Sequence, residues 1–164
     1  MAKTYVPLAT QTLGSAAASV TFSSISGAYT DLVLVCTGKT SNIEYPYLQF
    51  NSDTATNYSD THLYGDGSSA GSLRRSSVTA TRIAWSGYPM TTDGWISTCH
   101  IMNYANSTTN KTVLTRANMA GNGTSAIVGL WRSTAAITSI KVLMGSTDTF
   151  AIGSIFSLYG LAAA

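Results

Sequence analysis

Residues 31–38 read DLVLVCTG, and the five consecutive apolar side chains from Leu32 to Cys36 guide the interpretation of the rest of the chain. A short apolar run of this kind, bounded by turn residues, is typical of a strand that is covered on both faces. We therefore expect 31–38 to be a central strand of a β-sheet.

Other runs alternate between apolar and polar residues. In 137–144 (ITSIKVLM), Ile140, Val142 and Met144 are separated by single residues, and 154–161 (SIFSLYGL) has a similar pattern. Successive side chains of a strand point to opposite faces, so this alternation predicts strands with one face in the core.

The same reading along the whole sequence finds eleven strand-like runs. They are 4–13, 18–25, 31–38, 45–51, 61–65, 77–85, 95–103, 111–119, 126–132, 137–144 and 154–161. Clusters of Gly, Asn, Asp and Ser separate them, including GDGSSAGS at 65–72 and AGNGTS at 120–125. Many short strands at this spacing predict an all-β sandwich or barrel. We expect an all-β fold, a β-sandwich with jelly-roll topology, formed as one domain over 1–164.

The composition excludes several classes of protein. Only 10% of the 164 residues are charged, the net charge is +2, and Glu44 is the one glutamate. A nucleic-acid-binding protein usually carries a clustered basic stripe, and a membrane-surface protein usually carries a basic amphipathic helix. About 46 residues are Ser or Thr, roughly twice the usual share. Such a neutral surface is typical of a chain that functions in an assembly, because little charge keeps copies apart.

The cysteines and the two ends of the chain carry further predictions. Cys36 and Cys99 both lie in strand-like runs, where we expect buried free thiols. The opening MAKTYVP has no apolar stretch of the kind found in a signal peptide. The closing run 150–164 is shorter than the ~20 apolar residues of a membrane-spanning helix. We expect synthesis in the cytoplasm and no association with a membrane.

Two pairs of residues resemble parts of catalytic sites. Cys99 and His100 are adjacent, but neighbours on a strand point to opposite faces, so the imidazole does not reach the thiol. Asp60 and His62 are two residues apart and share a strand face, where we expect a hydrogen-bonded pair on the surface. No serine lies in a G-x-S-x-G motif that would complete a nucleophilic site. We expect no enzymatic activity.

The sequence contains candidate residues for two classes of ligand, calcium and sugars. The stretch 51–60 (NSDTATNYSD) offers oxygen ligands for calcium, but it lacks the glycine and final glutamate of an EF-hand loop, and turns also favour Asn and Asp. Trp85, Trp95 and Trp131 could form a platform for sugars, although aromatic residues more often pack between sheets. We expect no cofactor and no metal.

Arg74 and Arg75 are the only adjacent pair of cations in the sequence. Arginine is enriched in protein interfaces, so this pair is a candidate interface anchor; the alternative is an ordinary solvated pair.

Four segments resemble small β-rich structural proteins of tailed bacteriophages, including cyanophages. They are TYVPLATQTLGSAAASVTFSSISGAYTDLVLV (4–35), LQFNSDTATNYSDTHLYGDGSS (48–69), GLWRSTAAITSIKV (129–142) and FSLYGL (156–161). These segments follow the expected order from residue 4 to residue 161, so the resemblance spans nearly the whole chain. It consists of packing and turn motifs and implies no catalytic residue.

The resemblance implies a component of the virion. A single compact domain is more similar to a capsid decoration (cement) protein, which forms a homotrimer on the capsid exterior and binds the major capsid protein. The alternative is a receptor-binding or carbohydrate-binding module of a tail fibre or tailspike.

Overall fold

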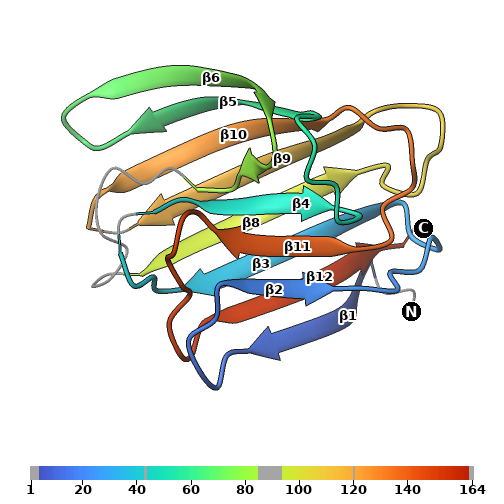
Figure 1. The fold of residues 1–164 in the computed structure, drawn as a ribbon, viewed down its shortest axis with the longest axis horizontal. Helices are drawn as coiled ribbons and strands as arrows, with labels where there is room; N and C mark the ends of the chain where they lie inside the picture. The colour runs from blue at the N-terminus through green and yellow to red at the C-terminus, as the bar shows by residue number, and fades with distance from the viewer. Residues whose placement is uncertain (1–3, 43, 85–93, 120, 163–164) are drawn as a thin grey trace.

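The computed structural model describes residues 4–42, 44–84, 94–119 and 121–162, and these residues form twelve β-strands and no helix (Figure 1). The strands are β1 (Tyr5–Thr12), β2 (Ser19–Phe22), β3 (Asp31–Gly38), β4 (Pro46–Phe50), β5 (Tyr58–Gly65), β6 (Ala70–Val78), β7 (Thr81–Arg82), β8 (Trp95–Met102), β9 (Lys111–Met119), β10 (Gly123–Trp131), β11 (Ile140–Met144) and β12 (Ile155–Leu161). The prediction of an all-β fold is confirmed.

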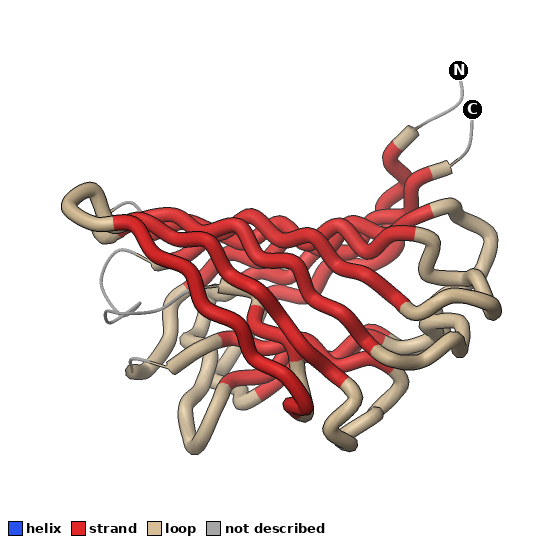
Figure 2. Tube along the Cα trace, turned by 90° about the horizontal axis from the view of Figure 1, so that it is seen from above, coloured by secondary structure: helices blue, strands red, loops and turns tan. Residues whose placement is uncertain are grey.

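The strands form two antiparallel sheets of unequal width (Figure 2). The large sheet has eight strands in the order β1-β12-β3-β8-β9-β10-β5-β6, and the small sheet has four in the order β2-β11-β4-β7. The sandwich is therefore confirmed. A jelly roll has eight strands in two Greek keys, and the division into eight and four does not confirm that predicted topology.

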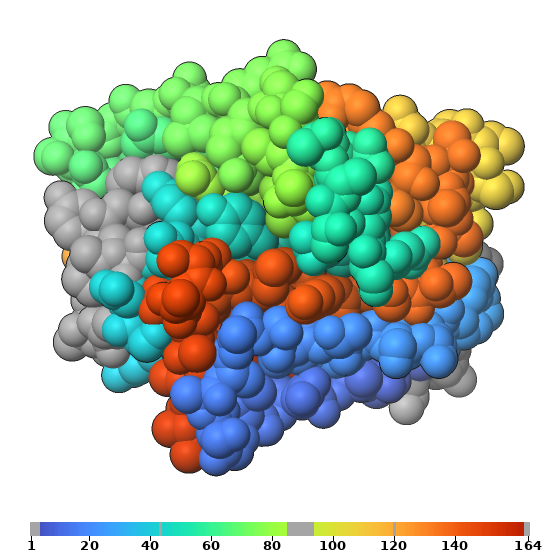
Figure 3. Space-filling view, viewed as in Figure 1, coloured from blue at the N-terminus to red at the C-terminus, as the bar shows by residue number. Residues whose placement is uncertain are grey.

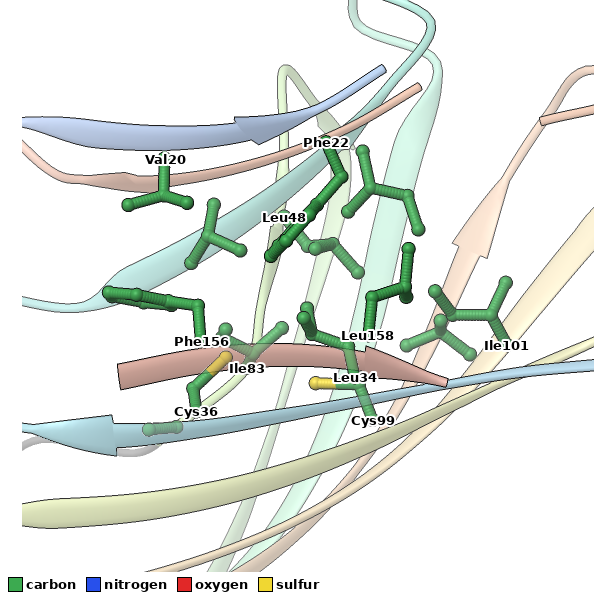
Figure 4. Packing of buried hydrophobic residues seen from close by; sticks show 14 of the residues in the cluster. Val20, Phe22, Leu34, Cys36, Leu48, Ile83, Cys99, Ile101, Phe156 and Leu158 are labelled. Atoms are coloured by element: carbon green, nitrogen blue, oxygen red, sulfur yellow. The ribbon is translucent and has the colours of Figure 1, made fainter. Parts of the chain in front are cut away.

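Strand β3 is central, as its apolar run predicts, because it pairs with β12 on one side and β8 on the other. Leu34 and Cys36 have no exposed surface, and Val33 on the opposite face is also buried. The core lies between the sheets, where β3, β8 and β12 contribute side chains that meet those of β2 and β4 (Figure 4).

The segment from 65 to 85 departs from the sequence prediction. Most of the expected loop 65–72 belongs to the β5–β6 hairpin, whose turn is closed by the Asp66 carboxylate accepting the N–H groups of Ser68 and Ser69. The expected strand 77–85 is interrupted. Its first two residues, Ser77 with a φ of 52° and Val78, end β6, and residues 79–80 separate them from β7. Only the two residues of β7 then pair with β4.

An aromatic group fills one end of the core. Trp131 stacks on Tyr58 with 6.3 Å between ring centroids and packs against Phe50 at 5.6 Å. Its indole N–H donates to the Asp53 carboxylate at 2.7 Å. This hydrogen bond ties the turn that follows β4 to the end of β10.

Strand β7 packs very closely on the large sheet. A Cβ at Gly129 of β10 would lie 2.4 Å from the Thr81 hydroxyl, so this position requires glycine. The close approach brings the backbone N–H of Arg82 within 3.0 Å of the Asp60 carboxylate in β5.

Both thiols are free and fully buried, as predicted. Burial raises the pKa of Cys36 well above its usual value and raises that of Cys99 to about 11. Because the thiolate is the reactive form, we expect a maleimide to label neither thiol in the native protein within minutes and both after addition of urea. Mass spectrometry after each treatment measures this; rapid labelling of native Cys36 would contradict its position in β3.

Candidate interaction surface

Arg74 and Arg75 lie on opposite faces of β6, as neighbours on a strand do. Arg74 is exposed on the side of the large sheet that faces away from the small sheet. Arg75 points inward, and its guanidinium lies over the ring of Tyr47 at 5.4 Å from the centroid. The two candidate interface residues therefore have different environments, and only Arg74 is fully available to a partner.

Asp60 is the centre of a buried ion-pair cluster. Arg75 donates from Nε to Oδ1 at 3.0 Å and from Nη2 to Oδ2, which makes the contact bidentate. The backbone N–H of Arg82 donates to Oδ2, and His62 Nε2 lies 2.8 Å from Oδ1. A carboxylate only accepts hydrogen bonds, so Nε2 is the protonated nitrogen of this ring.

These contacts control the ionisation of Asp60. Burial raises the pKa of its carboxyl, but the hydrogen bonds from His62, Arg75 and the Arg82 backbone outweigh burial and lower the pKa to about 2. The carboxylate is therefore charged at neutral pH. The cluster joins β5, β6 and β7, which belong to both sheets.

The predicted Asp60–His62 hydrogen bond is present, but its predicted place on the surface is wrong. Both side chains have zero exposed surface. The physical reason is that β7 covers this end of the large sheet. The sequence predicted one continuous strand over 77–85 and so did not predict this cover. Neither side chain is available to a molecule in solvent.

Cys99 and His100 point to opposite faces, as predicted. Cys99 is in the core, whereas the His100 side chain is partly exposed and its Nε2 lies 2.9 Å from the Asp31 carboxylate.

The remaining ligand candidates take part in packing and turns. Asp53 belongs to the candidate calcium-binding stretch 51–60. Its carboxylate accepts hydrogen bonds from Trp131, Asn57 and the Ala55 backbone. In the described ranges no three His, Cys, Asp or Glu side chains gather as a metal site would require. Trp95 and Trp131 are buried, so the packing interpretation holds for them, while Trp85 lies outside the described residues.

The side of the large sheet that faces away from the small sheet, here called the outer face, exposes a group of aliphatic side chains. Six of them are Leu63, Ile96, Met102, Leu114, Val128 and Ile155. Leu63 is 62% exposed and Leu114 is 47% exposed. The sequence alone does not identify these residues as exposed, because an alternating pattern does not tell which face of a sheet a second sheet covers.

The register aligns these residues across strands. Val128 of β10 lies opposite Leu114 of β9, and Leu114 lies opposite His100 of β8. On the outer face of the eight described strands, the charged side chains are Arg74, Arg116 and Asp31, as the alternation of burial shows, and Asp31 pairs with His100 on the same face. The outer face is therefore weakly charged and rich in aliphatic and hydroxyl side chains.

The outer face is wide enough for a stable protein contact. Eight strands at ~4.8 Å spacing and eight residues at ~3.3 Å give an area of about 1,000 Å² for the whole face. One partner in an interface of standard size contributes about 800 Å². The face, with its aliphatic and hydroxyl side chains, is therefore as large as the surface that one partner contributes to a stable contact.

The described part of the chain contains no helix with the length and apolar character needed to cross a membrane. No protein-family model matches the sequence, and no curated protein matches it either.

Proposed function

We propose that this protein is a structural component of a bacteriophage virion, a decoration protein that binds the capsid exterior and stabilises the DNA-filled head. The observation that carries the proposal is the outer face, an open eight-stranded surface with exposed Leu63, Leu114 and Val128 and few charges. The resemblance of the sequence to phage structural proteins favours the major capsid protein as the proposed partner.

The proposed mechanism is mechanical. Packed DNA presses the shell outward, and a decoration protein bound across neighbouring capsid subunits adds interface that must break before the subunits separate. We propose a homotrimer, because three linked contacts act at high effective concentration and dissociate far more slowly than one. The low charge of the chain is consistent with such permanent assembly.

The copy number per virion tests the location of the protein. Quantitative gel densitometry of phage particles that carry it is expected to give hundreds of copies, as a shell protein requires. A few copies per particle would instead indicate the tail, where a receptor-binding module is the alternative function.

Loss of the protein tests its role. Virions stripped of it are expected to release DNA sooner on heating or osmotic shock, and to adsorb to host cells at a normal rate. Attachment is expected to depend weakly on salt, because screening acts mainly on exposed charges. Stripped particles that are equally heat-stable but fail to adsorb would contradict the proposal.

A substitution on the outer face locates the contact. Leu114→Glu is expected to weaken binding to stripped particles at least tenfold, because it buries a charge in an apolar interface. Lys141→Glu, on the opposite side of the molecule in β11, is the matched control and is expected to bind normally.

A further inference from the structure

The small sheet leaves part of the large sheet uncovered beside β2. Strand β2 is the last strand of the small sheet and pairs only with β11, whereas β1 is the last strand of the large sheet (Figure 1). A groove of about 460 Å³ lies between them, lined by residues of β1 and β2, the segment 23–29 and Leu158 of β12. The surfaces of β1 and β2 lie side by side along the lower edge of Figure 3.

The groove has the chemistry of a site for an uncharged chain. Its lining combines apolar side chains such as Leu8, Phe22 and Ile25 with hydroxyl groups such as Thr21 and Tyr29. None of the residues that line it is charged. A charged segment would lose hydration there without gaining an ion pair.

Strand β2 offers free backbone groups to this groove. Met144 N–H donates to the Ala18 carbonyl at 3.0 Å, so Ala18 and Met144 are a hydrogen-bonded pair at the start of the β2–β11 ladder. This pair determines which residues of β2 bond to β11. Hydrogen-bonding residues alternate along such a ladder, so Val20 and Phe22 bond to β11. The N–H and C=O groups of Ser19 and Thr21 then point to the free side.

The other sheet edges carry features that oppose pairing with a further strand. Strand β1 contains Pro7, which has no N–H, and its register shifts beside this residue. Strand β6 carries Arg74 and Arg75 and an irregularity opposite Tyr58 and Asp60, and β7 has only two residues. Such prolines, charges and bulges protect natural edges. Strand β2 has none of these features.

We propose that the groove beside β2 binds an extended, uncharged peptide segment of a partner protein, which joins the small sheet as a fifth strand. Backbone hydrogen bonds to Ser19 and Thr21 would hold the segment, and alternate side chains would pack on Leu8 and Leu158. The contact covers about 13 Å along the four residues of β2, at ~3.3 Å per residue.

A separate polypeptide fits this groove better than a second copy of the chain. All twelve described strands already pair within the two sheets, so a second copy could contribute only the edge of a sheet that is part of a whole sandwich. The β1 edge of the large sheet extends beyond β2, as its residues in the groove lining show, and obstructs the approach of a whole sandwich. The inference is independent of the proposed role in the virion.

The test uses an acetylated and amidated octapeptide of alternating Val and Thr, titrated into the ¹⁵N-labelled protein. Strand addition of short peptides gives affinities toward the millimolar end of the scale, so the titration extends to about 5 mM. We expect saturable NMR shift changes confined to β2, β1 and 23–29, and slower hydrogen exchange of the Thr21 amide.

Two substitutions at one position separate backbone from side-chain effects. Thr21→Pro removes the free N–H without removing a ladder bond to β11, and is expected to weaken binding at least tenfold. Thr21→Val keeps the N–H and is expected to bind within threefold of the wild type. If Thr21→Pro does not fold, wild-type protein with an octapeptide N-methylated at alternate amides replaces it, and binding is expected to be lost.

Three results would overturn the inference. They are equal binding by folded Thr21→Pro, equal binding of the N-methylated peptide, and the absence of saturable changes in the groove. Concentration-dependent self-association that Thr21→Pro abolishes would also overturn it, because the occupant would then be a second copy.

Discussion

We expect Arg75→Gln to lower the free energy of unfolding by about 3 kcal/mol, because removing one partner of a buried ion pair leaves an uncompensated charge. The charge that remains is that of Asp60, whose side chain has no exposed surface. His62 and the Arg82 backbone still donate to it, so the expected loss is at the lower end of the range for buried pairs.

Arg74→Gln is the matched control, since the neighbouring residue has the same chemistry but points to solvent. Its free energy of unfolding is expected to change by less than about 0.5 kcal/mol. Urea unfolding of both variants measures the difference. Equal effects of the two substitutions would contradict the inward orientation of Arg75.

The effect of Arg75→Gln also depends on pH. The pKa of Asp60 is lowered to about 2 in the folded protein, whereas an unfolded aspartate has a pKa near 3.9. A lowered pKa stabilises the fold above the unfolded value, and this contribution disappears as the pH falls through the folded value. The difference between wild type and variant is therefore expected to be complete above about pH 5 and to shrink between about pH 4 and pH 2.

The second large effect is expected at Trp131. Trp131→Ala is expected to lower the free energy of unfolding by about 3–5 kcal/mol, because it leaves a cavity between Phe50 and Tyr58. Trp131→Phe keeps an aromatic ring but removes the indole donor to Asp53, and is expected to cost about 1–2 kcal/mol.

A substitution of an exposed apolar residue, Leu63, is the control for the two Trp131 substitutions. Leu63→Ala removes a large side chain that is 62% exposed, and is expected to change stability by less than about 0.5 kcal/mol. Thermal unfolding followed by far-UV circular dichroism measures all three variants. A small effect of Trp131→Ala would contradict a central role of this ring in the core.

Local sequence patterns predict the fold class and much of the core. The continuous apolar run of 31–38 predicted a central strand, and β3 is central because it pairs with β12 and β8. Only one of its faces lies under the second sheet, so the expected cover on both faces is not found among the described residues. Alternation predicted the buried side of β11, where Ile140, Val142 and Met144 all lie in the core. These properties follow from local patterns, since the side-chain period of a strand is fixed at two.

Which surfaces remain open and which polar groups become buried follows from how distant segments meet in the fold. Asp60 and His62 were expected on the surface, but the return of the chain at β7 covers them and supplies the Arg82 N–H. The outer-face residue Leu114 follows the same alternation as a buried strand residue, and it is exposed because the second sheet packs on the opposite face of the large sheet. Burial of this kind depends on which distant segments meet, and no pattern within one strand records it.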